Sequence, residues 1–220
     1  MKVLLVFLFA LPTIELAKVP AVLEAPPALE SLKSSRANIV QIISVSNAGP
    51  WGDWGLWDNC PEGSYANGFR MKVEPENVAD ETSVNSICLE CVYADTGLQA
   101  NRPCSSEGPW GDFRGPYTCP MVGNNRTYIV GFALKNQQPS VLGDETAVNN
   151  MKGVCRTFNG ASGITTIEGS GNRHGTYTAF SGTCPIGSAV CAILTRVEPD
   201  RGNFVDDTAL NDVQLACCAL

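Results

Sequence analysis

Three acidic stretches contain the residue types in this chain that could do chemistry. Each begins with a pair of acidic residues, reaches an Asn five positions after the first Asp, and reaches a Cys six positions after that Asn. Paired carboxylates could bind a cation or a sugar, or act as acid and base in glycoside cleavage, which needs two carboxyl groups about 5–10 Å apart. The candidate catalytic residues are Asp80, Asp144, Asp206 and Asp207.

The same stretches also have the composition of a structural turn. Asp, Thr and Asn side chains bond to neighbouring backbone groups and so stabilise a tight turn ahead of a strand. A fold that uses one turn three times needs these residues whatever the protein does, and we favour this interpretation. In a threefold arrangement the Asp residues would form one ring about the axis, and a second ring would contain Asn85, Asn149 and Asn211.

Aromatic residues beside Gly and Asp form the second candidate site. They occur in three corresponding openings, Trp51–Trp54, Trp110–Phe113 and His174–Tyr177. An indole ring beside a carboxylate is typical of a sugar-stacking surface. The candidate carbohydrate-binding residues are Trp57, Trp51, Trp110, Asp53 and Asp112. Trp57 has no counterpart in the other openings and is the first candidate for ligand contact. The only histidine, His174, occupies a Trp position and is predicted to pack.

The spacing of these motifs indicates an internal repeat. The acidic stretches begin 64 and then 62 positions apart, and each opening leads to a Cys-Pro pair and then to a segment of strand length. Apolar residues alternate in these segments, as at Phe69 and Met71, and no window has a helical period over eleven or more residues. The sequence predicts an all-β chain of three repeats with about four short strands each, at about 46–103, 104–163 and 164–220.

The ten cysteines predict up to five disulfides in an exported chain. Each repeat has one Cys before Pro and one on the apolar face of its last strand, which predicts Cys60–Cys91, Cys119–Cys155 and Cys184–Cys217. The other four cysteines lead to Cys88–Cys104 and Cys191–Cys218, although spacing alone does not exclude exchange between neighbours. Cys88 and Cys91 also have the spacing of a zinc or redox pair, but no second pair and no nearby His accompany them. We expect no metal and no cofactor.

The beginning of the chain predicts export. Residues 1–17 have a basic Lys2 and a short apolar run, as in a signal peptide, and the Pro- and Ser-rich residues 18–37 are expected to be a flexible leader. Residues 38–220 would then form one secreted, extracellular domain. The net charge of −7 argues against nucleic acid and anionic membranes as partners. Asn125-Arg126-Thr127 is a glycosylation acceptor, which predicts a surface loop glycosylated at Asn125.

With these motifs together, the chain resembles the vitelline membrane outer layer protein I family over about residues 38–220. The resemblance is carried by Gly49–Trp54, Cys60-Pro61, Gly68–Pro75, and Asp206–Leu215 with Cys217-Cys218. It implies a β-prism, in which three four-stranded Greek-key sheets stand around a pseudo-threefold axis. The chain departs from the family pattern in the additional Cys88 and Cys104, the long leader, and His174 in place of Trp.

The resemblance also implies a function. A member of this family is expected to be a secreted structural protein of an extracellular coat, such as the egg's outer vitelline layer, and to bind carbohydrate. Its partners would be extracellular glycans or coat proteins. The family's association with transfer among N-acetyl-chito-oligosaccharides leaves open an enzyme that uses paired carboxylates. A soluble lectin with up to three weak sites, one per sheet, is a third interpretation.

Overall fold

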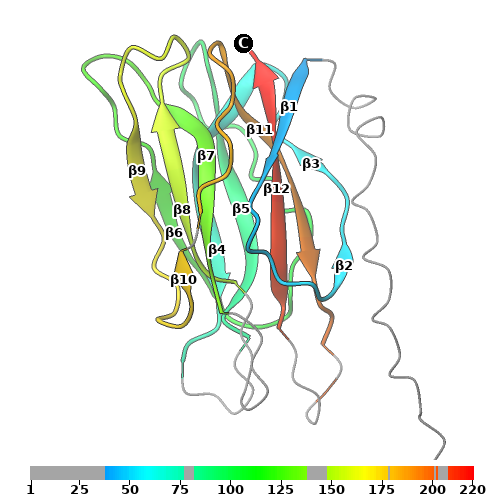
Figure 1. The fold of residues 1–220 in the computed structure, drawn as a ribbon. Coiled ribbons are helices and arrows are strands. Elements are labelled where there is room, and N and C mark those ends of the chain that lie inside the picture. The colour runs from blue at the N-terminus through cyan, green and yellow to red at the C-terminus, as the bar shows by residue number, and fades with distance from the viewer. Residues whose placement is uncertain (1–37, 77–81, 138–147, 178, 201, 203–207) are drawn as a thin grey trace, which may run out of the picture.

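The computed structural model describes residues 38–76, 82–137, 148–177, 179–200, 202 and 208–220 (Figure 1). All regular secondary structure in these ranges is β-strand. The strands are β1 (Ile39–Ser44), β2 (Asp53–Trp54), β3 (Asp58–Asn59), β4 (Ser64–Val73), β5 (Val84–Tyr93), β6 (Asp112–Thr118), β7 (Tyr128–Asn136), β8 (Val148–Arg156), β9 (Thr165–Glu168), β10 (Thr176–Tyr177), β11 (Ser188–Val197) and β12 (Leu210–Ala219). Within the described ranges, no helix has the length and apolar character needed to cross a membrane.

The strands form three sheets around one interior, which confirms the all-β prism (Figure 1). One sheet has the order β1-β12-β11-β2 with β3 also paired to β11, the second has β10-β7-β8-β9, and the third has β5-β4-β6. The strands β4, β7 and β11 each contact the other two, so they line the axis of the prism. The sheets therefore have five, four and three strands, where the resemblance implied four in each.

The count of five arises because the first opening forms two short strands, β2 and β3, that both pair with β11, and the count of three comes from one irregular edge. Residues 99–103 run beside β5 and bond to it at three places: Leu89 N–H to the Pro103 carbonyl (2.9 Å), Cys91 N–H to the Asn101 carbonyl (3.3 Å), and Ala100 N–H to the Cys91 carbonyl (2.8 Å). Proline has no N–H to give to a ladder, so Pro103 interrupts this edge. The segment occupies the place of a fourth strand without regular pairing.

Each repeat gives its opening strand to the sheet of another repeat. In the second repeat, β6 pairs with β4 of the first, and in the third repeat β10 pairs with β7 of the second. The opening strands of the first repeat, β2 and β3, pair with β11 of the third. Strand β1 pairs with β12 and so joins the two ends of the described chain. The sheets consequently do not coincide with the sequence repeats.

The core follows the predicted alternation. Phe69 and Met71 are fully buried, whereas Arg70 and Lys72 between and beside them are partly exposed. Five disulfides reinforce this core, and their pairs are those predicted from the sequence: Cys60–Cys91, Cys88–Cys104, Cys119–Cys155, Cys184–Cys217 and Cys191–Cys218. Three of them join the Cys-Pro loop of a repeat to its last strand, with Cα separations of 5.6–5.7 Å.

Candidate functional site

The acidic stretch of the first repeat ends in a hydrogen-bonded turn. Thr82 donates its N–H (3.1 Å) and its hydroxyl (2.6 Å) to the Glu74 carboxylate at the end of β4. The Asn85 side chain donates to the Thr82 hydroxyl oxygen at 2.6 Å, and Ser83 between them has a φ of 60°. A non-glycine residue at positive φ is uncommon and is held here by the bonds on both sides.

The third repeat builds the same turn. The N–H and hydroxyl of Thr208 donate to Glu198 at 3.1 and 2.6 Å, and Asn211 donates to the Thr208 hydroxyl oxygen at 2.7 Å. Ala209 has a φ of 47° at the position of Ser83. The Thr and Asn of the repeated stretch therefore serve the turn, as the structural interpretation predicts. The four candidate catalytic residues Asp80, Asp144, Asp206 and Asp207 lie outside the described residues.

The Asn of each repeated stretch also anchors the opening of another repeat. Its backbone carbonyl accepts an N–H from Gly108 at Asn85 (2.7 Å), from Asn172 at Asn149 (2.9 Å), and from Gly49 at Asn211 (2.9 Å). In the first of these contacts the Asn85 side-chain oxygen also accepts the N–H of Trp110 at 3.2 Å. These bonds place the three openings at the end of the prism where the turns at Thr82 and Thr208 lie.

At a glycine in each opening, the backbone passes in close contact with the end of a central strand. Gly52, with a φ of 82°, lies so close to the backbone of Val197 and Glu198 that a Cβ would overlap with it, and Gly111 and Gly175 make the equivalent approaches to β4 and β7. The preceding Trp51 and Trp110 are left 47% and 46% exposed, and His174, in the equivalent position, is partly exposed. Two indole rings are therefore presented to solvent beside the turns.

A groove of about 350 Å³ lies between the opening of the first repeat, the loop ahead of the second opening, and the end of β11. Trp54 and the exposed carboxylates of Asp53, Glu107 and Asp200 line it. Trp110 directly follows Pro109 of the lining, and Trp51 stands two residues before Asp53. This arrangement combines aromatic rings with hydrogen-bond acceptors, which is the chemistry that recognises a polyol such as a sugar.

The equivalent region of the second opening lies between that opening, the loop ahead of the third opening and the end of β4, and side-chain contacts bridge it. Arg114 donates to the Ser170 carbonyl at 2.8 Å, and the hydroxyls of Tyr117 and Ser170 are 2.5 Å apart. Arg173 pairs with Glu76, with its N–H 2.6 Å and its Nε 3.3 Å from the carboxylate oxygens. Asp112, a carbohydrate-binding candidate, is exposed on this side. The three openings are therefore related in backbone but differ in what they present to a ligand.

Trp57, the first candidate for ligand contact from the sequence, is less exposed than Trp51 and Trp110. Its partly buried side chain packs against the hydrophobic core, and its indole N–H is enclosed without an acceptor among the described residues. The geometry therefore favours Trp51 and Trp110 over Trp57 as rings that meet a ligand. The groove residues Glu107 and Asp200 were missed by sequence reasoning. The Val-Glu-Pro sequence that recurs at Glu74 and Glu198 could have identified the two carboxylates that accept hydrogen bonds from the turns.

An ion pair supports the groove from beneath. The Arg196 guanidinium lies 5.2 Å from the Trp54 ring centre and 3.4 Å from the Asp212 carboxylate, and it donates to the Gly49 carbonyl. The side chains of Arg196 and Asp212 are 6% and 13% exposed. Burial raises the pKa of Asp212 to about 6, against the lowering effects of Arg196 and of the Val213 N–H.

We expect Asp212→Asn to weaken the pH dependence of stability between pH 4 and 7. A carboxyl whose pKa is higher in the folded state favours folding while protonated, so its contribution is fully present below pH 3.8 and is lost as the pH rises through 6. The loss amounts to about 3 kcal/mol. Urea unfolding of both proteins at pH 4 and pH 7 measures it, and equal changes in the two proteins would contradict the expectation.

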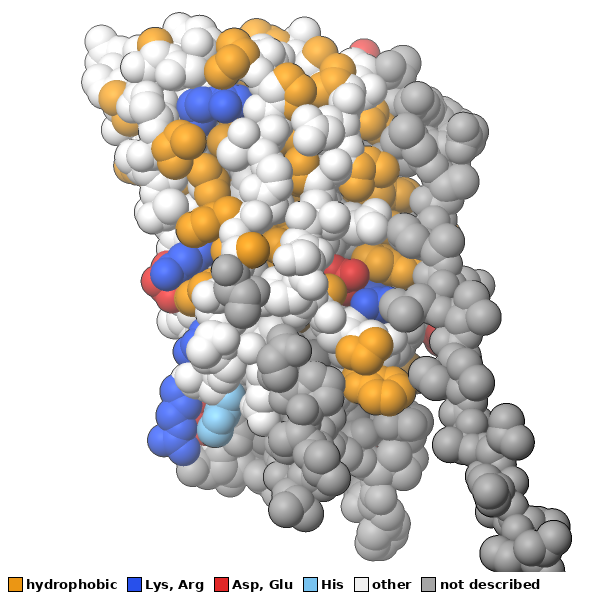
Figure 2. All heavy atoms as spheres, in the orientation of Figure 1, with side chains coloured by type: hydrophobic (Ala, Val, Ile, Leu, Met, Phe, Trp, Pro, Cys, Tyr) orange, Lys and Arg blue, Asp and Glu red, His pale blue; other side chains and the backbone are white. Residues whose placement is uncertain are grey.

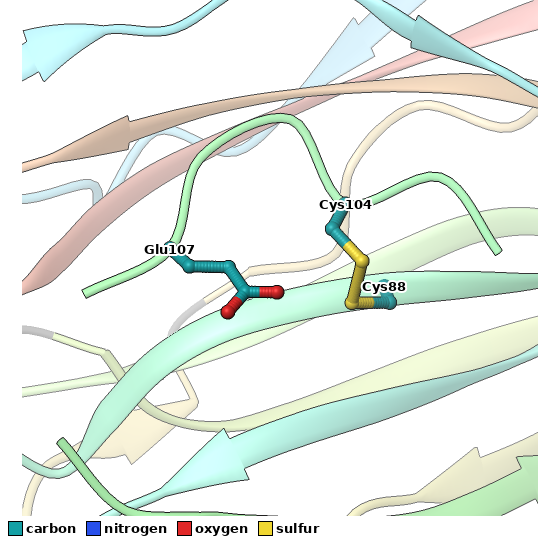
Figure 3. A group of neighbouring side chains, drawn as sticks. All are labelled: Cys88, Cys104 and Glu107. Carbon is teal, nitrogen blue, oxygen red and sulfur yellow. A yellow bond between two sulfur atoms is a disulfide. The ribbon is translucent and has the colours of Figure 1, made fainter. Parts of the chain in front are cut away.

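Cys88, Cys104 and Glu107 are the one group in the described ranges whose potential ligand atoms lie close enough to hold a metal ion (Figure 3). The two sulfur atoms are bonded to each other, so neither is a free thiolate, and Glu107 lies 3.7 Å from the Lys72 ammonium. Cys91 is bonded to Cys60. The Cys88–Cys91 spacing therefore belongs to two separate disulfides, and the zinc or redox interpretation does not hold.

Comparison with known proteins gives matches over most of the chain. A model of the family described as vitelline membrane outer layer protein I (VOMI) matches residues 41–220. The vitelline membrane outer layer protein 1 homolog of Mus musculus is 37% identical over 162 residues, which cover 73% of this chain and 74% of that protein. The homolog of Homo sapiens is 36% identical over 161 residues, which cover 72% and 73%.

Solved structures show weaker likenesses. Calystegia sepium agglutinin has a TM-score of 0.46 and 12% identity, covering 81% of this chain and 96% of that chain. Artocarpin, solved in complex with mannopentose, has a TM-score of 0.44 and 15% identity, covering 81% and 98%.

Proposed function

This chain belongs to the vitelline membrane outer layer protein I family, and from that membership we propose that it is a secreted structural protein of an extracellular coat that binds carbohydrate. Five disulfides suit an oxidising, extracellular setting. In this proposal, residues 1–17 direct export and are removed, and the partners are glycans or other coat proteins.

The observation that carries carbohydrate binding is the open groove beside two exposed indole rings. A pyranose ring would stack on Trp110 or Trp51 through its apolar C–H face, and its hydroxyls would donate to the carboxylates of Asp53, Glu107 and Asp200. The groove lies at the low end of the roughly 300–1,000 Å³ range of small-molecule sites, so it would accept one or two sugar rings of a longer glycan.

We expect Trp110→Ala to weaken binding of N-acetyl-chito-oligosaccharides at least about tenfold, a loss of about 1.4 kcal/mol from the missing stacking surface. Trp51→Ala should act in the same direction. Ile186→Ala serves as the control, because Ile186 is also exposed but lies in the Cys-Pro loop at the opposite end of the strands. Isothermal titration calorimetry on the folded variants gives the affinities. Equal affinities of wild type and both Trp variants would rule out this surface.

The carboxylates of the groove favour one second candidate, a transferase acting on N-acetyl-chito-oligosaccharides. The candidates would be Asp53, Glu107 and Asp200 together with the sequence candidates Asp80, Asp144, Asp206 and Asp207. Mass spectrometry after incubation with these oligosaccharides distinguishes a transferase from a protein that only binds them. New chain lengths that vanish in Asp→Asn variants would make the protein an enzyme. Binding without turnover indicates a lectin-like coat protein, and no response leaves a coat protein whose partner is another protein.

A further inference from the structure

A second groove lies at the opposite end of the prism from the acidic turns, independent of the proposed carbohydrate site. The strands β5, β8 and β12 end there, and β4, β7 and β11 begin there, at the upper end in Figure 1. Hydrophobic side chains gather over the upper half of the face seen in Figure 2. The groove has a volume of about 380 Å³.

The lining of this groove mixes aromatic and polar groups. Its aromatic part is Phe158 with Tyr128, whose ring centres are 4.5 Å apart, and Tyr65 packs edge-on to Phe158 at 4.9 Å. Asp95 and Asn159, both exposed, supply hydrogen-bonding groups. An apolar surface of rings bordered by a carboxylate and an amide suits a sugar with an acetamido group.

The predicted glycosylation acceptor, Asn125, is itself part of the lining. Its side chain is exposed, and its backbone is held in a short hairpin by two bonds with Val122, each 3.0 Å. The third residue of the acceptor, Thr127, is buried and donates its hydroxyl to the Pro120 carbonyl at 2.6 Å. The hairpin therefore fixes where a sugar on Asn125 begins.

The acceptor arises from an insertion in one repeat. Ser64 and Ser188 make the same bond to the carbonyls of Pro61 and Pro185 at 2.7 Å. Two residues separate Pro from Ser in those repeats, whereas six separate Pro120 from Thr127. The added residues form one wall of the groove and carry Asn125. The insertion thus creates the groove wall and the acceptor together.

We propose that the glycan on Asn125 folds back into this groove, so that its first N-acetylglucosamine packs on Phe158 and Met121 and bonds to Asn159 or Asp95. Attachment joins the Asn125 side-chain nitrogen to the sugar C1. The oligosaccharide comes from a lipid-pyrophosphate donor, the amide loses one proton, and the lipid pyrophosphate leaves. Because the sugar is tethered at the groove, its effective concentration exceeds that of free glycans. It would cover the partly exposed Phe158 ring and the exposed Met121 side chain.

The test uses the full chain secreted from glycosylating cells. Its intact mass is compared before and after trimming by an endoglycosidase that leaves one N-acetylglucosamine, and with Asn125→Gln. We expect the trimmed protein to keep a Tm about 2–4 °C above that of Asn125→Gln and to show slower hydrogen exchange at residues 94–98 and 157–160. Asn159 Oδ1 also accepts the Thr157 hydroxyl at 2.8 Å and the Ala161 N–H at 3.1 Å, so Asn159→Ala is compared with the double variant Asn159→Ala/Asn125→Gln. Asn159→Ala should retain the sugar mass, and the Tm difference within this pair should be smaller than the difference between the trimmed protein and Asn125→Gln.

Two results would overturn the proposal: a mass without glycan, or a glycan that changes neither Tm nor exchange relative to Asn125→Gln. Removal of the Asn125 glycan should leave chito-oligosaccharide binding at the other end unchanged. Failure of this proposal is therefore separate from failure of the proposed function.

Discussion

Gly52→Ala is expected to lower the free energy of unfolding by about 3–4 kcal/mol. Two effects add at this position. The backbone has a φ of 82°, which an L-residue adopts at a cost, and the new Cβ would overlap with the backbone of Val197 and Glu198. The strand end cannot move away easily, because Glu198 also holds the Thr208 turn. Urea unfolding measures the loss.

Gly187→Ala is the matched control for this experiment. Gly187 has nearly the same φ, 81°, but apart from its two chain neighbours no residue has an atom within 4 Å of where its Cβ would lie. Its substitution should cost only the conformational part, about 1 kcal/mol. If the free energy of unfolding fell by the same amount in both variants, the close approach of the opening to β11 would contribute nothing to the cost of Gly52→Ala.

Removing the Cys184–Cys217 disulfide by paired alanine substitutions is expected to cost about 3–4 kcal/mol. The bond closes 33 residues of chain, and both cysteines are buried in the core of the third repeat. The unfolded chain gains the conformational freedom that the bond had removed. Thermal unfolding under non-reducing conditions, with the other four disulfides verified by mass, provides the measurement.

The Cys88–Cys104 pair gives the comparison. It closes only 16 residues and ties β5 to the irregular edge, where Cys104 is partly exposed. On loop length alone its removal should cost about 0.6 kcal/mol less than that of Cys184–Cys217, and relaxation of the edge should reduce the cost further. A larger loss from the Cys88–Cys104 variant than from the Cys184–Cys217 variant would contradict this ranking.

Local features of the fold could be predicted from the sequence because they follow from local patterns. The alternation of Phe69 and Met71 with charged residues assigned one face of β4 to the core, and the cysteine positions on strand faces led to the five pairs found in the structure. The repeated Thr and Asn predicted a turn, and the bonds at Thr82 and Asn85 form it.

The arrangement of the candidate groove could not be predicted in the same way. Its walls come from Asp53, Glu107 and Asp200. Asp53 meets Asp200 because β2 pairs with β11, and Glu107 joins them because the neighbouring Ser105 and Ser106 bond to Thr195 of β11. No sequence pattern records that pairing. Trp57 was favoured as a ligand residue because it lacks counterparts, but a residue without counterparts can also serve packing, and the partly buried Trp57 lies against the core. Its role in ligand contact stays a prediction.

Because the opening strand of each repeat pairs with a strand of another repeat, every repeat needs its neighbours to complete its sheet. An isolated repeat would lack the strand that covers one edge of its sheet, and its own opening would have nothing to pair with. The repeats should accordingly unfold together in one transition. Strand β1 lies antiparallel to β12, with Ile39 opposite Cys218, so the start of β1 and the end of β12 are neighbours. A circular permutant that links these ends and opens another loop would keep every strand pair.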